Sequence, residues 1–439
     1  MPAAPLHVIV VGAGTGGLCL AHGLRRAGLR VTVYERDRTR TAARPGHRTG
    51  LDPRGLRALR ACLPPELFRT LLAAGAVPPE RFVLLDRRLR PVLAVPLPGG
   101  GAGPGSAPEL SVSAMTLRQL LLTGLEDAVR FGRTATGHRS HPDGSVSARL
   151  DDGTEDRGDL LVGADGAPSC LLPPHPAPPA AAGRGSVLIG AKVPLIAESR
   201  ALLPPALAPG AGLVRAPRGL SVLLHRMELP WDRYGELKPG LPAEDAALLA
   251  RWPGLPFDNS RDHIDVGLRT PAGRLPADVA LRPGDDLVRL ALGLDPRLHP
   301  DLRRLLELAD PATGFAASAP RPAGPAPWPA GPVALLGDAA RPAAPGPGGA
   351  SAALRDARAL VDALTRVRDG LASLDDALLD YRSAAERHSA GAAGPGRPFD
   401  AEHLLHGARP ARIALAGVRG RLRAAVPGPR TNGRAAAGS

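Results

Sequence analysis

Two separated groups of glycine and acidic residues are the parts of this chain best suited to chemistry. Near the start, Gly12, Gly14 and Gly17 keep the spacing G-x-G-x-x-G, which lets the backbone turn tightly and approach a dinucleotide pyrophosphate. Far downstream, Gly337-Asp338 follows an apolar run and could present a carboxylate to sugar hydroxyls. A nicotinamide dehydrogenase needs only the first signal. A flavin enzyme that encloses its cofactor between both ends of the chain needs both.

The first motif has the flanking elements that such a loop requires. Residues 6–11 form a short apolar run typical of a buried parallel strand. A helix is expected over residues 15–27, with its free N–H groups and its dipole directed at the phosphates. The next strand, over residues 31–34, leads into Glu35, at the spacing of an acid that binds a ribose hydroxyl. Glu35 argues against a 2′-phosphate, since two anions repel; the alternative is a glycine-rich turn without a ligand.

Two other acidic residues stand where a strand is expected to end. Asp165-Gly166 follows the apolar run 160–162, so Asp165 could reach a cofactor group. A structural Asx turn at Asp165 is an equal alternative. Asp338 is ambiguous in the same way, because a residue at the start of a helix can act as a cap instead of a ligand.

Composition narrows the classes of function. A length of 439 residues suits two packed domains. No run approaches 18 uninterrupted apolar residues, and the first strand starts too early to leave room for a signal peptide. Cys19, Cys62 and Cys170 lack metal-ligand spacing, so we expect no metal and a reducing, cytoplasmic compartment. The net charge of +13 comes from dispersed arginines, with Lys192 and Lys238 the only lysines and 3% aromatic residues, so we expect no specific nucleic-acid partner.

The order of the elements predicts an α/β fold (α+β overall), in which a Rossmann-like domain is interleaved with a mainly β substrate-binding domain. The predicted units are residues 1–172 with an inserted segment around 78–114, the mainly β domain 183–320, a return to the first domain over 321–426, and a disordered tail over 427–439. The return begins with a strand at 333–336. Helices are predicted near 53–59, 66–72, 117–129, 350–366 and 374–388.

Taken together, the motifs resemble the para-hydroxybenzoate hydroxylase-like FAD-dependent monooxygenases, in particular bacterial members that act on aromatic and polyketide-type compounds. The similarity covers residues 6–390 and is carried by residues 11–18 with Glu35, then 116–121, 159–169, 335–340 and 354–357. It implies FAD as cofactor and NADPH or NADH as a transient reductant. It also implies O2 and a small apolar molecule as co-substrates, with one oxygen atom transferred through a flavin C4a-hydroperoxide.

The resemblance also implies which residues hold the cofactor: Gly12, Gly14, Gly17, Glu35, Arg36, Arg48, Arg118, Asp165, Gly166, Gly337, Asp338 and Gly348. Among them, the first three glycines and Glu35 would hold the adenosine diphosphate half. Arg48 and Arg118 would contact FAD near its phosphates and ribityl chain, and Asp338 the ribityl hydroxyls. Asp165-Gly166 would serve both FAD and the nicotinamide.

No catalytic residue is assigned from the sequence. His47, His225 and His263 are candidate bases in the substrate pocket, although a histidine at such a position is more often packed or on the surface.

The chain departs from the family pattern on the flavin side. Arg341 stands where the family has His, the loop 345–351 lacks the usual Asn and contains Pro347, and Leu172 stands where Arg is usual. Weak FAD binding or slow reduction is therefore expected. The alternative is a degenerate, non-catalytic relative that binds FAD or a metabolite. A flavin-dependent halogenase is disfavoured because its Trp-x-Trp-x-x-Pro signature is absent.

Overall fold

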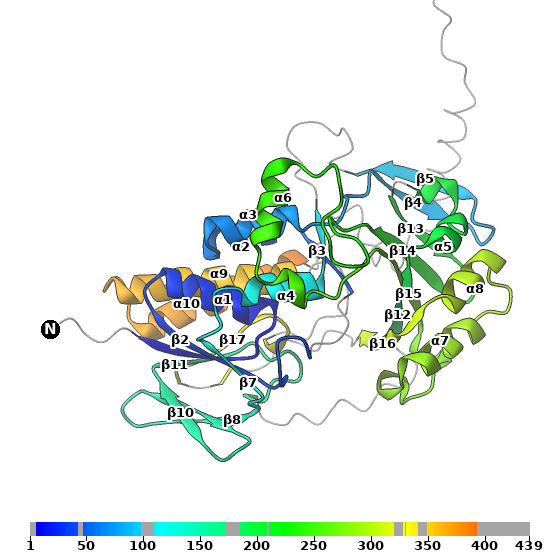
Figure 1. The fold of residues 1–439 in the computed structure, drawn as a ribbon. Helices are drawn as coiled ribbons and strands as arrows, with labels where there is room; N and C mark the ends of the chain where they lie inside the picture. Colours follow the sequence, from blue (N-terminus) through cyan, green and yellow to red (C-terminus); the bar gives the residue numbers. More distant parts are fainter. Residues whose placement is uncertain are drawn as a thin grey trace, which may run out of the picture.

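The computed structural model describes residues 6–42, 47–97, 109–172, 185–208, 210–319, 328–329, 331–340 and 349–392. The predicted tail 427–439 and the candidate residues Arg341 and Gly348 lie outside them. The described residues form two large sheets, each with its own helices (Figure 1).

The first sheet contains the strands predicted for the nucleotide-binding domain. It has five parallel strands in the order β17-β11-β1-β2-β7. Their bounds are β1 His7–Val11, β2 Arg30–Glu35, β7 Val129–Phe131, β11 Leu160–Gly163 and β17 Val333–Leu335. β1 and β11 are buried along their whole length, as their continuous apolar sequences predict. β17 pairs in parallel with β11, so the chain after residue 332 adds a strand to the first sheet.

Helices cover this sheet, and most begin where the sequence predicts. Their bounds are α1 Thr15–Arg26, α2 Pro53–Cys62, α3 Pro65–Ala73, α4 Ala114–Leu122, α9 Gly349–Arg368 and α10 Leu374–Ala392. α2 starts sharply because the Asp52 carboxylate accepts a hydrogen bond from the Gly55 N–H (2.7 Å) and proline follows Asp52. α1 packs closely on α9 at Gly23, where any larger side chain would overlap Val361.

The predicted helix over 117–129 is wrong in its extent. α4 starts earlier, because the Ser113 hydroxyl caps it by accepting from the Met115 N–H (3.2 Å), and ends at Leu122. Gly124 then takes a φ of +81°, and Val129 begins strand β7. The apolar residues after Leu122 are buried in a turn and a strand. Their spacing along the sequence resembles that of a helix, so the pattern alone does not distinguish the two.

Two small sheets accompany the first. β8 Ala135–Ser140, β9 Val146–Leu150 and β10 Glu155–Gly158 form a three-stranded antiparallel meander, which contains the strand and turn predicted around residues 146–153. β3 Arg48–Leu51 and β6 Leu110–Ser113 form an antiparallel pair.

The second large sheet has seven strands in the order β16-β12-β15-β14-β13-β4-β5. Their bounds are β4 Arg81–Leu85, β5 Pro91–Pro96, β12 Ser186–Pro194, β13 Gly210–Arg215, β14 Ser221–Met227, β15 His263–Pro271 and β16 Asp310–Ala319. The inserted segment around 78–114 therefore contributes two strands to this sheet, with β4 parallel to β13. One face packs on α7 Gly284–Gly293 and α8 Pro300–Glu307 through a core of aliphatic side chains. We call the other face the inner face.

The part of the molecule built on the first sheet and the part built on the second sheet are its two halves. The segment between β14 and β15 connects them. It carries α6 Ala243–Arg251, which packs against α3. Trp231 and Trp252 from this segment are buried in the same core as α1 and α9. No helix in the described part of the chain is long and apolar enough to cross a membrane.

Candidate functional site

The β1–α1 loop is tightly packed inside and open at one point. Gly12 has a φ of +105°, and a side chain on it would come within 2.5 Å of the Ala164 carbonyl oxygen. A side chain on Gly17 would overlap the Gly12 carbonyl oxygen. A Cβ on Gly14, in contrast, would meet only the Ala164 oxygen, at 3.8 Å. Gly12 and Gly17 are therefore required by the fold, whereas Gly14 leaves space for a ligand to approach the backbone.

The N-terminus of α1, immediately after this opening, has the properties of an anion site. Its N-cap is Gly14, which offers no side-chain cap, and its first turn contains no acidic residue. The first N–H groups of the helix and the positive end of its dipole therefore have no side chain of that turn to neutralise them. A phosphate fits this chemistry.

Glu35 lies beside the loop, where β2 ends, and only 6% of its surface is exposed. Its carboxylate accepts hydrogen bonds from the Ala13 N–H (2.8 Å) and the Asp37 N–H (2.9 Å). Arg118, on α4, forms an ion pair with Asp37 (2.9 Å) and lies 3.8 Å from Glu35. The Arg118 Nε is buried and has no hydrogen-bond partner among the described residues. This unused donor next to an open glycine loop fits an oxygen atom of a bound nucleotide.

The other two strand ends reach the same edge of the sheet. The Ala164 N–H donates to the Val11 carbonyl (2.7 Å), which fixes the turn of Asp165 against the glycine loop. Asp165 uses one carboxylate oxygen to accept from the Cys170 N–H (2.8 Å), which lies five residues on and not two as in an Asx turn, while its Oδ1 is buried without a partner in the described chain. Asp165 therefore has a structural hydrogen bond other than the Asx turn considered, and its contact with a cofactor stays a prediction. Gly166 follows with a φ of +82°.

Asp338 lies in the short 3₁₀ turn Gly337–Ala339, directly after β17, and is exposed. Gly337 has a φ of +60°, and its N–H donates to the buried Asp356 carboxylate (3.2 Å). The turn is thus held from behind by α9, with Asp338 on its outer side. Arg36 is exposed just beyond Glu35.

Arg48 lies apart from the Glu35–Arg118 group. Its N–H donates to Asp265 (2.6 Å), and its guanidinium donates to Ser111 (3.0 Å) and His225 (3.1 Å) and pairs with Glu109. These contacts place the Arg48 side chain between β6 and the inner face of the second sheet. The predicted phosphate or ribityl contact of Arg48 remains a prediction.

Two of the three candidate histidines, His225 and His263, lie on strands of the second sheet, and His47, just before β3, contacts that sheet. His47 donates from Nδ1 to Asp265 (2.8 Å) and from Nε2 to the Thr313 carbonyl (2.8 Å). Burial would raise the pKa of Asp265, but the hydrogen bond and the charge of His47 outweigh it and lower that pKa well below its usual range. Burial and the nearby Arg48 charge lower the pKa of His225 far below the ordinary value, so His225 is neutral and accepts from Arg48.

Asp265 is the functional-site candidate that sequence reasoning missed. It alternates with Ile264 and Val266, which are buried on the opposite face of β15. A carboxylate between the apolar residues Ile264 and Val266 was the available signal. Its partner His47 is over two hundred positions away in the chain, so the pairing could not be predicted.

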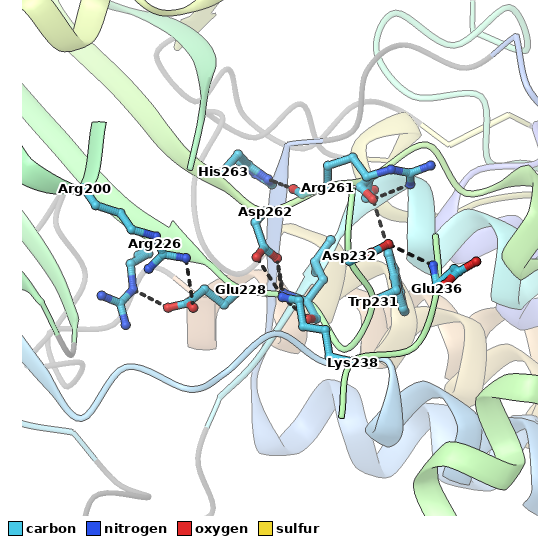
Figure 2. Close-up of polar contacts among 12 residues, drawn as sticks. Arg200, Arg226, Glu228, Trp231, Asp232, Glu236, Lys238, Arg261, Asp262 and His263 are labelled. Carbon is cyan, nitrogen blue, oxygen red and sulfur yellow. Dashed lines mark hydrogen bonds and ion pairs between the residues drawn. The ribbon is translucent and has the colours of Figure 1, made fainter. Parts of the chain in front are cut away.

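Figure 2 shows the polar contacts that close the segment between β14 and β15. The Lys238 ammonium donates to both Asp262 oxygens (2.7 and 2.9 Å) and to the Leu229 carbonyl (2.8 Å). The Trp231 indole N–H donates to the Ser260 carbonyl (2.9 Å). These bonds hold the start of β15, and hence His263 and Asp265, in place.

Comparison with known proteins agrees with this geometry. A family profile described as an NAD(P)-binding Rossmann-like domain matches residues 10–62. The chain is 27% identical over 398 residues to a dual O-methyltransferase/FAD-dependent monooxygenase of Cercospora beticola, covering 86% of this chain and 44% of the relative. It is 30% identical over 384 residues to another such dual enzyme, of Phaeosphaeria nodorum, covering 81% and 40%. A crystal structure of a putative FAD-containing monooxygenase from Photorhabdus luminescens superposes with a TM-score of 0.69, at 23% identity, over 87% of this chain and 94% of that one.

The chain is a relative of the FAD-dependent monooxygenases and has their fold. This confirms the predicted fold class and family resemblance. The chain spans less than half the length of the two dual enzymes. The opening at Gly14, the uncapped α1 N-terminus and the unpartnered Arg118 Nε fit the adenosine diphosphate half of FAD. The described residues contain no group of His, Cys, Asp and Glu that could hold a metal ion.

Proposed function

We propose that the protein is an FAD-dependent, NAD(P)H-using monooxygenase that hydroxylates or epoxidises an apolar aromatic or polyketide-type small molecule. The observation that carries the proposal is the meeting, at one edge of the first sheet, of the opening at Gly14, the buried Glu35 and the unpartnered Arg118 Nε. The relatives' names, which specify FAD-dependent monooxygenases, support the activity.

Each of these residues has a role that follows from its contacts. Glu35, already held by two backbone N–H groups, would accept a hydrogen bond from a ribose hydroxyl. The Arg118 Nε and the N-terminus of α1 would donate to the pyrophosphate. Asp338, on the outer side of its turn, would accept from the ribityl hydroxyls. FAD, when bound, supplies the redox and oxygen chemistry.

The substrate would lie against the inner face of the second sheet. Leu188 and Leu223 on this face are only partly buried, and a Cβ on Gly267 between them would meet no atom closer than 3.1 Å. Such a surface suits an apolar ring system. The arginine and histidine contacts of β3 border this surface.

A second candidate is a non-catalytic relative that binds FAD or a metabolite. Leu172 favours it, because its side chain packs with the apolar cluster around Val11 and Leu161, where the family has Arg. Formation of an oxygenated product distinguishes the two candidates. NADH consumption alone does not, because it also accompanies the release of peroxide without oxygen transfer.

The first test is the visible spectrum of the purified protein before and after incubation with FAD and desalting. Absorption bands at about 370 and 450 nm are expected, with a stoichiometry of one flavin per chain. Glu35→Ala and Asp338→Ala should each lower FAD affinity while the protein stays folded. NADPH- or NADH-dependent oxygenation of aromatic test compounds, followed by mass spectrometry, then tests catalysis. A protein that never retains FAD would refute the proposal; one that binds FAD without forming product would favour the second candidate.

We further propose that the protein works in a reducing compartment such as the cytoplasm and has no specific nucleic-acid partner. The described cysteines Cys19, Cys62 and Cys170 are all free thiols, which supports a reducing environment.

A further inference from the structure

A cavity of about 530 Å³ lies between α2, α9 and α10 (Figure 1). α2 and α9 approach closely near their N-terminal ends, where a side chain on Gly55 would come within 2.7 Å of the Ser351 hydroxyl. Further along the two helices the cavity is lined by Ala58, Ala61 and Ala359, whose short side chains leave the space open. Its volume is that of a small-molecule site. We call it the arginine cavity, because of the side chains around it.

Four arginines line the arginine cavity, two from each of two helices. Arg54 and Arg57 belong to α2, and Arg355 and Arg358 belong to α9. In each pair the residues are three apart, so both side chains lie on the same face of their helix. Asp362 is the one acidic residue among the described residues that line the cavity. Positive charge therefore faces the same space from two sides and outweighs the negative charge there.

The protein itself neutralises this charge only in part. Arg358 donates from Nε to Asp362 (2.7 Å), so the one carboxylate of the cavity is already paired. Arg54 and Arg57 are exposed, and neither makes a hydrogen bond or an ion pair with a described residue. Their guanidinium groups are available to an anion that enters the cavity.

The third side of the cavity, formed by His388 on α10, is held in place by hydrogen bonds. The His388 Nδ1–H donates to the buried Asp356 carboxylate (2.8 Å). The Arg355 guanidinium donates to the carbonyls of Ser351 (3.3 Å) and His388 (3.4 Å). Asp356 also accepts from the Gly337 N–H (3.2 Å), so this wall is connected to the turn that follows β17. The wall is therefore formed before any ligand binds.

We propose that the arginine cavity binds a small molecule that carries a diphosphate group. Guanidinium groups bind phosphate oxygens through paired N–H donors, which gives geometric specificity as well as charge. Because the arginines stand in pairs on two helices, two linked phosphates can contact both pairs, whereas a single phosphate can contact one. None of the residues to which the proposed function assigns FAD lines this cavity, so its ligand is an additional one.

The test is calorimetric titration of the full-length protein with inorganic pyrophosphate, at about 150 mM salt to suppress general charge attraction. FAD is kept in excess, so that its own site is filled. Pyrophosphate should bind at one per chain with a Kd below about 1 mM, and about tenfold more tightly than sulfate. ADP is titrated in parallel. Binding at least as tight as that of pyrophosphate assigns a nucleoside diphosphate, and weaker binding assigns free diphosphate.

Variants of matched charge locate the site. Arg54→Gln and Arg57→Gln should each weaken pyrophosphate binding about fivefold or more. Arg60→Gln removes the same charge from an exposed position of the same helix that does not line the cavity, so it should bind pyrophosphate like the unchanged protein. Asp362→Asn should bind it about threefold or more tightly, because the variant removes the carboxylate that competes for Arg358.

Equal losses in Arg57→Gln and Arg60→Gln would show attraction to the overall positive charge and overturn the proposal. An absence of pyrophosphate binding, or equally tight binding of sulfate, would do the same. Tighter binding of hexaglutamate would make the cavity a contact for an acidic protein instead. Gly14→Ala, which should weaken FAD binding, should leave pyrophosphate binding unchanged; a loss there would place pyrophosphate at the FAD site. If the protein never bound FAD, the proposed function alone would fail, because the arginine cavity does not depend on it.

Discussion

At the scale of single residues, several histidines are held neutral inside the protein. His22, on α1, is 4% exposed, and its Nε2–H donates to the Leu121 carbonyl (2.9 Å). Burial lowers its pKa to about 4. Because the unfolded chain binds this proton more readily, acid favours unfolding as the pH falls from about 6.5, and the loss from this residue is complete near pH 4.

We therefore expect His22→Gln, which can keep the donor to Leu121, to flatten the pH dependence of stability. At pH 4 the unchanged protein should have lost about 3 kcal/mol more of its unfolding free energy, relative to pH 7, than the variant. Urea unfolding followed by circular dichroism at both pH values measures this difference. Identical losses in the two proteins would show that His22 does not carry the effect.

The residue scale is also where sequence reasoning is weakest. Gly12, Gly17 and Glu35 could be singled out because of their spacing and their positions at the ends of strands. The hydrogen bond between His47 and Asp265 depends on which strands lie side by side. So does the proximity of Lys192 to His263. Strand order in the second sheet cannot be read from local periodicity.

At the scale of elements, the β1–α1 loop separates two demands on glycine. Gly14→Ala should leave the unfolding free energy within about 1 kcal/mol, since Gly14 has an ordinary φ of −81° and open space at its Cβ. Its methyl group would occupy the approach to the backbone, so FAD affinity should fall about tenfold or more. Flavin fluorescence titration measures the affinity.

Gly17→Ala is the matched comparison in the same loop. Its methyl group would overlap the Gly12 carbonyl oxygen, so the fold itself should lose about 1–3 kcal/mol along with FAD affinity. If Gly14→Ala bound FAD like the unchanged protein, the pyrophosphate would not approach at this position.

Most elements of the first half could be predicted because apolar strands and amphipathic helices alternate there with clear boundaries. The exception was the region after α4, where Thr123 and Gly124 end the helix and apolar residues continue into β7. A run of apolar residues indicates that a segment is buried. Burial alone does not distinguish a helix from a turn followed by a strand.

At the scale of the whole molecule, the two halves share a core. Trp231 belongs to the chain segment of the second sheet, yet it is completely buried among residues of the first half, and its ring centroid lies 6.4 Å from that of Trp252. Trp231→Ala should lower the unfolding free energy by about 3–5 kcal/mol. Urea unfolding followed by circular dichroism and by the fluorescence of the remaining tryptophans should give one coincident transition. Two separate transitions would show that the halves unfold independently.

The interleaving has a consequence for how the chain is made. β17 lies next to β11, and α9 covers α1, but both elements come after residue 332. At usual synthesis rates the ribosome needs roughly 15–70 s to reach them. During that time the edge of β11 and the apolar side of α1 are without their final partners. Nascent chains should therefore depend on chaperones until late in translation, and fragments that stop before β17 should aggregate.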